Sequence, residues 1–381
     1  MKKRCFLEFA SALFATSVWP AAATPLVTTP SACTLAAAWR SNEGVQGDFV
    51  GLLRADWAQA QIQVQAAVPV PSRAHGLLAE PGGGFLAVAS RPGQWLLRCD
   101  EQGKVVQWHQ MEREAEGRRL DGHVCASLDG EWLYTTETNP LSGQGWIAVR
   151  ERRTLRKVAE WRTHGIEPHQ ALLDASGALV VANGGILRAE GDKKRDLHLM
   201  DSSLVRLNPT TGERLSQWRL KDPRLSLRHL AWSHLGSNAG ASASGKPLLG
   251  IALQAEHDDL TQRRAAPVLA VWDGEKLITP SLVSAGMGYA GDIAAGPEGG
   301  FVVSCQRAGM AVQWRPEAPA ELVAVAQLQE VCALAPWQAD MSAHGVLMGA
   351  GRGLGRWHPT MSPGFLRWPS AMALDNHWVT V

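Results

Sequence analysis

Short apolar runs separated by turn residues recur along the whole chain. Each repeat begins with a pair of residues, usually with His second, followed by an apolar run, a turn and a second apolar run. The first clear copy is Ala74-His75-Gly76-Leu77-Leu78. Runs of this kind bounded by turn residues are typical of β-strands. Units of roughly 40–60 residues built from such strands predict a β-propeller.

Seven copies of the pair can be recognised, and five of them place His at the second position. The chain contains only 12 His among 381 residues, so this concentration indicates a shared role for the equivalent positions. The second positions are His75, His123, His169, His229, Asp292, Cys332 and His377.

The first and last segments of the chain complete each other. The apolar runs Cys33–Trp39, Asp48–Leu53 and Gln61–Val70 form a unit without a first strand, and the C-terminal segment His377–Val381 matches the missing strand. A last strand that pairs with the first unit closes the ring and removes an open sheet edge. We therefore expect one all-β domain over residues 33–381, a seven-bladed β-propeller closed by N- and C-terminal strands. Six blades are the alternative, because the spacings are uneven.

Two polar insertions interrupt the later units. They are Leu187–Ser203, between the second and third strands of the fourth unit, and Glu256–Arg264 in the fifth. Long insertions of this kind are usually functional loops or surface segments.

Composition adds limits on function. A hydrophobic fraction of 45% and a charged fraction of 19% fit a globular protein with a full core. The net charge of +1 gives no reason to expect nucleic acid or an anionic membrane surface as a partner. Most of the 16 Trp are expected to pack between blades.

The N-terminus has the features of an export signal. Lys2-Lys3-Arg4 precedes the apolar run Phe9–Trp19, which is too short to span a bilayer, and Ala21-Ala22-Ala23 offers a small-residue cleavage site. We expect a signal peptide over residues 1–23 and a loose lead-in over residues 24–32. The segment Lys3–Leu7 resembles a twin-arginine motif with Lys for the first Arg, so the Sec and twin-arginine routes both remain open. After export five Cys remain, of which at least one is unpaired within a monomer.

The seven repeated positions form the candidate metal site. In a propeller the first strand of each blade lines the central channel, so its first residue should lie at one mouth. Imidazole, carboxylate and thiolate are the ligands of zinc, copper and iron. One metal ion takes about four to six ligands, so a subset, a cluster or a central bound ligand would be required. The alternative is that these His form hydrogen bonds to neighbouring blades or to channel water.

A second set of polar residues is expected on the same face. The loops between second and third strands open there, and His164 and Arg228 lie close in sequence to His169 and His229. Guanidinium groups pair well with carboxylate or phosphate, so an anionic ligand is one interpretation; pairing with nearby acidic residues is the other. The candidate ligand-binding residues are Arg40, Arg91, Glu137, His164, Asn183, Arg228, Arg307 and Arg352.

Several common catalytic motifs are absent from the sequence. No Gly-x-Ser-x-Gly elbow, P-loop or His-Glu-x-x-His motif occurs. A lactonase-like centre would need several carboxylate or Asn ligands, whereas the expected ring is mostly imidazole.

Several longer motifs occur in order along the chain. They include Arg73-Ala74-His75-Gly76, Ser90-Arg91-Pro92-Gly93, Thr163-His164-Gly165-Ile166-Glu167-Pro168-His169, Ser226-Leu227-Arg228-His229 and Asp375-Asn376-His377. This set of motifs resembles the bacterial periplasmic family called domain of unknown function 1513. The resemblance covers about Thr34 to Val381 and implies a seven-bladed propeller. Genes of that family often lie near those of imelysin-like iron-regulated proteins and dihaem peroxidase-like proteins, which implies a role in envelope iron handling and no particular reaction.

We therefore expect a soluble periplasmic binding or accessory protein that engages a transition metal, iron or copper, at the His-rich channel mouth. Its partners would be a small anionic or metal-containing ligand, another envelope protein, or both. One alternative is a metal-dependent oxidoreductase or hydrolase that uses the same site. Another is a platform that docks a second envelope protein. Because propellers serve all these functions, the fold alone does not choose among them.

Overall fold

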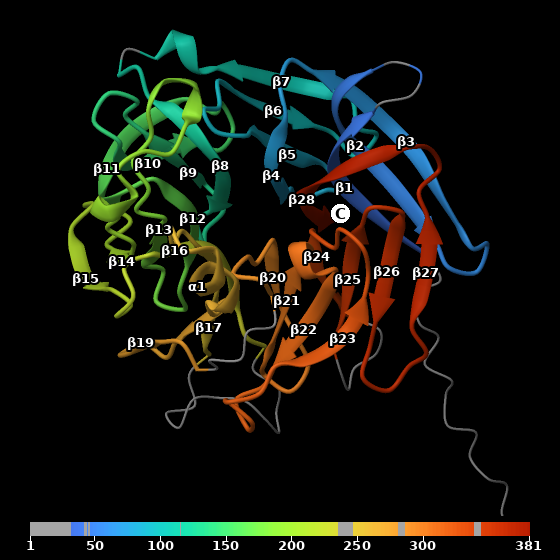
Figure 1. Ribbon diagram of the computed structural model, residues 1–381. Coiled ribbons are helices and arrows are strands. Elements are labelled where there is room, and N and C mark those ends of the chain that lie inside the picture. The colour runs from blue at the N-terminus through green and yellow to red at the C-terminus, as the bar shows by residue number, and fades with distance from the viewer. Residues whose placement is uncertain are drawn as a thin grey trace, which may run out of the picture.

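The chain forms a ring of seven antiparallel four-stranded sheets in a computed structural model (Figure 1). The structure describes residues 32–41, 44, 46–114, 116–234, 247–280, 286–338 and 344–381. The expected signal peptide, and the lead-in except for its last residue, lie outside the described residues. The prediction of a seven-bladed propeller is confirmed, and the six-bladed alternative is wrong.

The first three blades follow the strand order expected from the sequence. From the channel outwards, the first blade contains β28 (Met372–Thr380), β1 (Ala32–Ser41), β2 (Gly47–Asp56) and β3 (Gln61–Val70). The second contains β4 (Ala74–Ala79), β5 (Phe85–Ala89), β6 (Trp95–Cys99) and β7 (Val105–Gln110). The third contains β8 (Arg119–Ala126), β9 (Trp132–Thr138), β10 (Gln144–Glu151) and β11 (Lys157–Ile166).

The remaining four blades repeat this arrangement. The fourth contains β12 (Pro168–Leu173), β13 (Leu179–Asn183), β14 (Ser203–Leu207) and β15 (Arg214–Trp218). The fifth contains β16 (Leu225–Trp232), β17 (Leu249–Ala255), β18 (Leu269–Trp272) and β19 (Leu277–Ile278). The sixth contains β20 (Asp292–Ala295), β21 (Phe301–Cys305), β22 (Met310–Trp314) and β23 (Val323–Gln327). The seventh contains β24 (Leu334–Gln338), β25 (His344–Ala350), β26 (Gly353–Trp357) and β27 (Gly364–Arg367).

The two chain ends close the ring as the sequence predicts. β28 pairs antiparallel with β1, with Ala37 opposite Trp378 and Leu35 opposite Thr380. β28 therefore supplies the innermost strand of the first blade, and Figure 1 shows it near the centre of the ring. The innermost strands contact each other in sequence around the channel, in the order β28, β4, β8, β12, β16, β20, β24 and back to β28.

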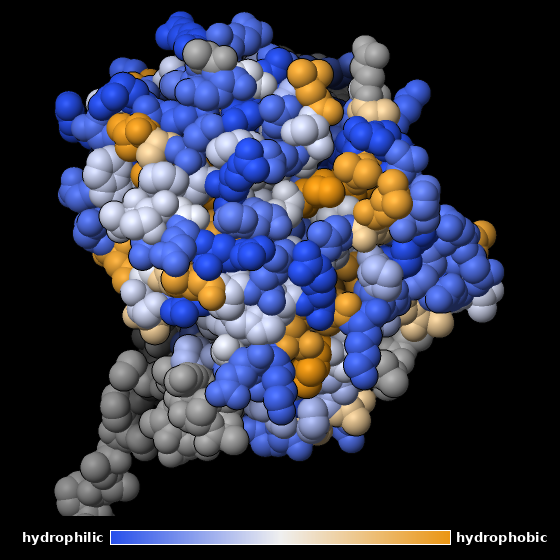
Figure 2. Space-filling model, turned by 90° about the vertical axis from the view of Figure 1, so that its left-hand side faces the viewer, coloured by the Kyte–Doolittle hydropathy of each residue, from blue (hydrophilic) through white to orange (hydrophobic). Residues whose placement is uncertain are grey.

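The hydrophobic core lies between neighbouring blades. One cluster combines Leu35 and Trp39 of the first blade with Trp337 and Leu347 of the seventh, and Trp378 of β28 is 3% exposed within it. Burial of large side chains on both faces of each sheet holds adjacent blades together. The outer surface seen in Figure 2 is mainly hydrophilic, with hydrophobic residues in small groups.

Both polar insertions carry short helical turns. The first holds η2 (Glu190–Asp192) and η3 (Leu197–Leu199), and Lys194 pairs with Glu256 of the second. The second insertion holds α1 (Leu260–Ala265). The other helical turns are η1 (Met111–Arg113) and η4 (Gln306–Ala308). Among the described residues there is no helix with the length and hydrophobicity that crossing a bilayer requires.

Candidate metal centre at the channel mouth

Five His side chains project into the channel from irregular points of the innermost strands. The pairing of β4 with β5 shifts register between Ala74 and Leu77, which spans His75. Corresponding shifts span His123 in β8, His169 in β12, His229 in β16 and His377 in β28. A β-bulge leaves a residue outside the ladder and redirects its side chain. The five bulges therefore turn five imidazoles toward one place.

This arrangement corrects one expectation. The sequence predicted that each His begins an innermost strand, but His123, His229 and His377 lie well inside β8, β16 and β28. Each of these strands begins several residues before its His. The polar residues Asp121 and Asn376 gave no sign in the sequence that the strand had already begun. The convergence of the imidazoles was expected and its cause was not.

The five imidazoles form a compact cluster. Nine of the ten pairs of rings are in contact, with distances between ring centroids from 4.3 Å for His229 and His377 to 5.7 Å for His75 and His229. Four of the five residues are buried, being between 4% and 7% exposed: His75, His123, His169 and His229.

Gly122 allows the His75 ring to approach the backbone of the third blade closely. Its φ of +104° lies in a region that side chains disfavour, and a Cβ there would lie 2.9 Å from Cδ2 of His75. The second blade can therefore bring its imidazole directly against the backbone of the third.

Each imidazole of the cluster has a ring nitrogen without a hydrogen-bond partner. Nδ1 of His75 lies 2.7 Å from Oδ1 of Asp375, and this contact fixes the proton on Nδ1 and leaves Nε2 as an acceptor. Nε2 of His169 and Nε2 of His229 lie 2.7 Å apart. The buried nitrogens without a partner are Nε2 of His75, His123 and His377, and Nδ1 of His169 and His229.

The buried imidazoles are held neutral. Desolvation lowers the pKa of His75 to about 4 against the opposing effect of Asp375. It also lowers the pKa values of His123, His169 and His229 well below the usual range, and the neighbouring imidazoles and Arg228 act in the same direction. Neutral imidazole is the form that binds metal ions.

Two overlapping groups have ligand atoms within 4.8 Å of one another. The first is His75, His123, His169 and His229, and the second is His229, Asp292 and His377. Two ligands on opposite sides of one metal ion, each about 2.1 Å from it, lie about 4.2 Å apart, so small side-chain rotations would close either group around an ion. The site thus fits a metal held mainly by imidazole.

The remaining two members of the predicted ring differ from the His. Oδ1 and Oδ2 of Asp292 accept hydrogen bonds from the backbone N–H groups of Ile293 and Leu334, and Oδ2 lies 3.4 Å from Nδ1 of His377. Burial raises the pKa of the Cys332 thiol to about 12, and its Sγ lies 3.7 Å from the backbone oxygen of Asp375. The structure therefore brings Asp292 to the cluster and gives Cys332 a structural contact instead.

A group of Arg side chains surrounds Glu167 beside the cluster. Oε1 of Glu167 lies 2.9 Å from Arg91 Nη1, 2.5 Å from Arg188 Nη2 and 3.1 Å from Arg228 Nη1. These cations outweigh desolvation and lower the pKa of Glu167 to about 2. Asp192 pairs with Arg91 and Arg188, so three guanidinium groups share two carboxylates.

Asp121 lies between this group and the imidazoles. It is 1% exposed, Oδ2 accepts a hydrogen bond from Thr138, and Oδ1 has no partner. Burial raises its pKa to about 7, although Arg91 acts in the opposite direction.

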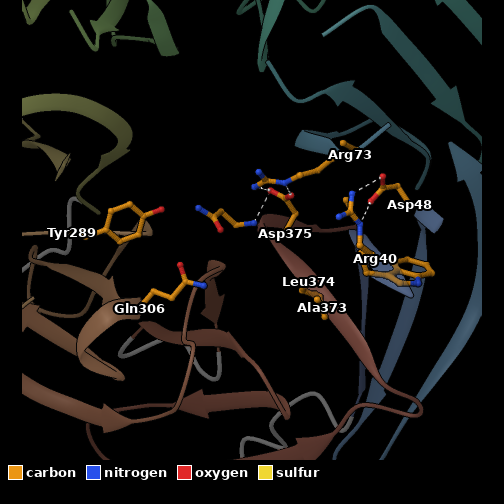
Figure 3. A pocket seen from close by; sticks show the side chains of 12 residues that line it. Arg40, Asp48, Arg73, Tyr289, Gln306, Ala373, Leu374 and Asp375 are labelled. Atoms are coloured by element: carbon orange, nitrogen blue, oxygen red, sulfur yellow. Dashed lines mark hydrogen bonds and ion pairs between the residues drawn. The ribbon is translucent and has the colours of Figure 1, made fainter. Parts of the chain in front are cut away.

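Two cavities open at the mouth. An inner cavity of about 130 Å³ is lined by His75, His169 and His229 together with Arg73, Arg91 and Arg228. An outer cavity of about 440 Å³ shares Arg73, Tyr289 and Asn376 with it. Figure 3 shows the outer cavity, with the Arg73–Asp375 pair facing Tyr289 and Gln306.

The other predicted ligand residues have varied surroundings. Arg40 pairs with Asp48 in the outer cavity, and the guanidinium of Arg307 lies 4.5 Å from the ring centroid of Tyr289. Glu137 is fully buried in ion pairs with Arg150 and Lys157.

The structure records no contact between the imidazoles and the other three predicted residues. Nδ2 of Asn183 donates to the backbone oxygen of Thr163. His164 is an exposed residue near the end of β11, and Arg352 is an exposed residue of a turn.

The sequence did not reveal the residues that support the cluster. Arg73, Asp121, Arg188 and Asp375 were not predicted as site residues. Asp375 precedes His377 by two positions and Asp121 precedes His123 by two, so a carboxylate two residues before a ring His is the signal that could have found these two Asp residues.

A family comparison extends over most of the chain. The model of the family described as "Protein of unknown function (DUF1513)" matches residues 68–381. No curated protein matches the chain.

Solved structures share the fold. A protein from Lactobacillus plantarum has a TM-score of 0.59 and 12% identity, over 92% of this chain and 99% of that chain. A streptogramin B lyase has a TM-score of 0.53 and 11% identity over 80% and 86% of the two chains. Virginiamycin B lyase from Staphylococcus aureus has a TM-score of 0.51 and 10% identity over 78% and 84%. At these identities the similarity concerns the fold, and function has to be argued from the site.

Proposed function

Since the chain belongs to the family described as protein of unknown function (DUF1513), we propose a function from its site: a periplasmic accessory protein that binds a transition-metal ion at the five-His cluster. One observation carries the proposal. Every imidazole of the cluster has a ring nitrogen with no hydrogen-bond partner, although four of the five residues are almost fully buried.

The energetic argument follows from burial. A buried polar atom without a partner costs about 1–3 kcal/mol, and five such atoms in one place need a compensating interaction. A bound metal ion would accept lone pairs from the imidazoles of one of the two ligand groups together. Because the imidazoles are already neutral, a metal ion displaces few protons on binding.

The support around the cluster agrees with this function. A metal-binding His usually donates its other ring N–H to a carboxylate, and Asp375 has this relationship to His75. Asp292 offers a carboxylate beside His229 and His377. Imidazole with carboxylate suits iron, copper and zinc, and we propose iron as the cargo with copper as the alternative.

Titration of the purified protein with metal tests the proposal. Fe(II) under anaerobic conditions, Cu(II) and Zn(II) would each be added to chelator-treated protein, followed by desalting and elemental analysis. We expect retention of about one metal ion per chain. The double variant His123→Leu/His169→Leu should lose this metal. The control His164→Leu/His198→Leu removes two imidazoles outside the cluster and should retain it. No retained metal in the unmodified protein, or equal retention in both variants, would refute the proposal.

An enzyme that uses the same metal is the second candidate. The inner cavity lies directly against three of the imidazoles, and Asp121, with a pKa of about 7, lines it as well. A metal-dependent hydrolase or oxidoreductase could bind a small substrate there, with Asp121 exchanging a proton. Turnover that requires metal and is lost in Asp121→Asn, while metal content is unchanged, would favour this candidate over simple binding.

A further inference from the structure

We propose that the two cavities at the channel mouth bind a small polycarboxylate anion, with Arg73 as its principal cationic contact. The inference deepens the proposed function, because the anion would lie beside the metal ion and balance its charge. Its anion-binding part rests on the cavities alone and can be measured without metal.

The two cavities are neighbours, because they share lining residues. Arg73, Tyr289 and Asn376 line both of them. The inner cavity reaches the imidazoles, and the outer one extends past Arg73 to Arg40 and Gln306 (Figure 3). The outer volume of about 440 Å³ falls within the range of small-molecule sites.

Arg73 has donors available to a ligand. Its guanidinium pairs with Asp375 through Nε and Nη2, yet its side chain is 52% exposed, while that of Asp375 is 4% exposed. A guanidinium carries five N–H donors, so several remain free to face the cavity. Arg40 pairs with Asp48 in a similar way, with a side chain that is 59% exposed. Both cations are thus held in place by a carboxylate and still open to the cavity.

The charge balance favours an anion. Arg91, Arg188 and Arg228 share Glu167 and Asp192, which leaves one positive charge in excess beside the inner cavity when the buried Asp121 next to them is protonated. A divalent metal ion would add two positive charges. Asp292 balances one of them, and the neutral imidazoles balance neither. Buried charge without a counterion is costly. A carboxylate in the inner cavity supplies the missing counterion.

Because the cations line two neighbouring cavities, a polycarboxylate can contact more of them than a single carboxylate can. One carboxylate can face Arg91 and Arg228 in the inner cavity while a second reaches Arg73 and Arg40 in the outer one. Guanidinium groups bind carboxylates through paired hydrogen bonds. The uncharged groups of Tyr289 and Gln306 provide hydrogen bonds to a hydroxyl on the same molecule.

Calorimetric titration with citrate tests the inference. Citrate would be added to metal-free protein and to Zn(II)-loaded protein, with glycerol as the uncharged comparison. We expect citrate to bind the metal-free protein, to bind the loaded protein at least tenfold more tightly, and glycerol not to bind. Arg73→Met should weaken citrate binding to the metal-free protein at least tenfold.

The control is Arg219→Met, because Arg219 makes an exposed two-point pair with Asp201 like that of Arg73 with Asp375. This variant should bind citrate normally, and circular dichroism melting would establish that both variants fold. Zn(II) binding without any citrate binding, or an Arg73→Met variant that binds citrate like the unmodified protein, would overturn the inference and leave the proposed function intact. Citrate binding without metal retention would uphold the anion site and refute the metal site.

Discussion

Asp375 and His75 lie in contact although 300 residues separate them in the chain: Oδ1 of Asp375 is 2.7 Å from Nδ1 of His75. The contact exists because β28 returns to the centre of the ring beside β4. The contact thus connects closure of the propeller to the orientation of His75, a candidate metal ligand. Arg73 pairs with the same carboxylate and lines the outer cavity.

Removal of the Asp375 carboxylate should weaken metal binding without abolishing it. In Asp375→Ala the His75 ring loses the partner that fixes its tautomer, and loss of such a partner typically costs 10–100-fold in metal affinity. Competition with a chromophoric chelator would measure the affinity. Asp201→Ala, which removes an exposed carboxylate paired with Arg219, is the control and should leave the affinity unchanged. Equal affinities for Asp375→Ala and the unmodified protein would contradict the role of Asp375 in orienting His75.

Metal-free protein should lose stability as the pH falls below about 6.5. In the unfolded chain His titrates near pH 6.5, whereas burial holds the pKa of His75 at about 4 and those of His123, His169 and His229 well below the usual value. The unfolded state therefore binds more protons in this window, and stability falls as the pH decreases toward the lowered pKa values. For His75, whose pKa in the folded state is about 4, this loss amounts to about 2 kcal/mol between pH 7 and pH 5.

Urea unfolding at pH 7.5 and pH 5 measures this effect. The variant His123→Leu/His169→Leu removes two of the titrating groups, so its stability should fall less between the two pH values. A loss as steep as that of the unmodified protein would show that these imidazoles do not stay neutral in the folded state.

Replacement of Glu167 should strongly destabilise the folded protein, because Glu167 is the shared counterion of the Arg group. In Glu167→Gln the three guanidinium groups lose their shared carboxylate, and only Arg91 and Arg188 keep an ion pair with Asp192; removal of one partner from a buried ion pair costs about 3–5 kcal/mol. Glu298→Gln removes the partner of Arg315 in an exposed pair and should cost less than about 1 kcal/mol. Chemical denaturation of both variants gives the comparison, and similar small losses would mean that the Arg group does not depend on Glu167.

Closure by β28 should hold the first and seventh blades together. Trp378 is 3% exposed between them, so Trp378→Ala should lower the free energy of unfolding by about 3–5 kcal/mol. Trp132 is 37% exposed, and its replacement by Ala should have a much smaller effect. A Trp378→Ala variant as stable as Trp132→Ala would indicate that the blades hold together without this contact.

The fold was accessible from the sequence because each blade repeats the same local pattern. The pair containing His75 recurs often enough to reveal the blades, and the segment His377–Val381 supplies the strand that Cys33–Val70 lacks. Strand alternation and turn residues are local properties, so they can be read without tertiary information.

The site was only partly accessible. The five His were found because a repeat marks them, but the bulges that aim them depend on pairing with the next strand, which the sequence does not display. The sequence placed Glu137 on a loop at the channel mouth, but it lies in β9, and its ion pairs with Arg150 and Lys157 bury it within its own blade. The pairing of Asp375 with His75 is a contact between distant segments, and no local pattern predicts such a contact.

X-ray absorption spectroscopy of the metal-loaded protein tests the central claim most directly, because it identifies the atoms bound to the metal. With Zn(II) the account predicts one ion per chain with at least three imidazole nitrogens at about 2.0–2.1 Å, and loss of this signal in His123→Leu/His169→Leu. A first shell made of oxygen or sulfur alone, or a spectrum unchanged in the double variant, would contradict it.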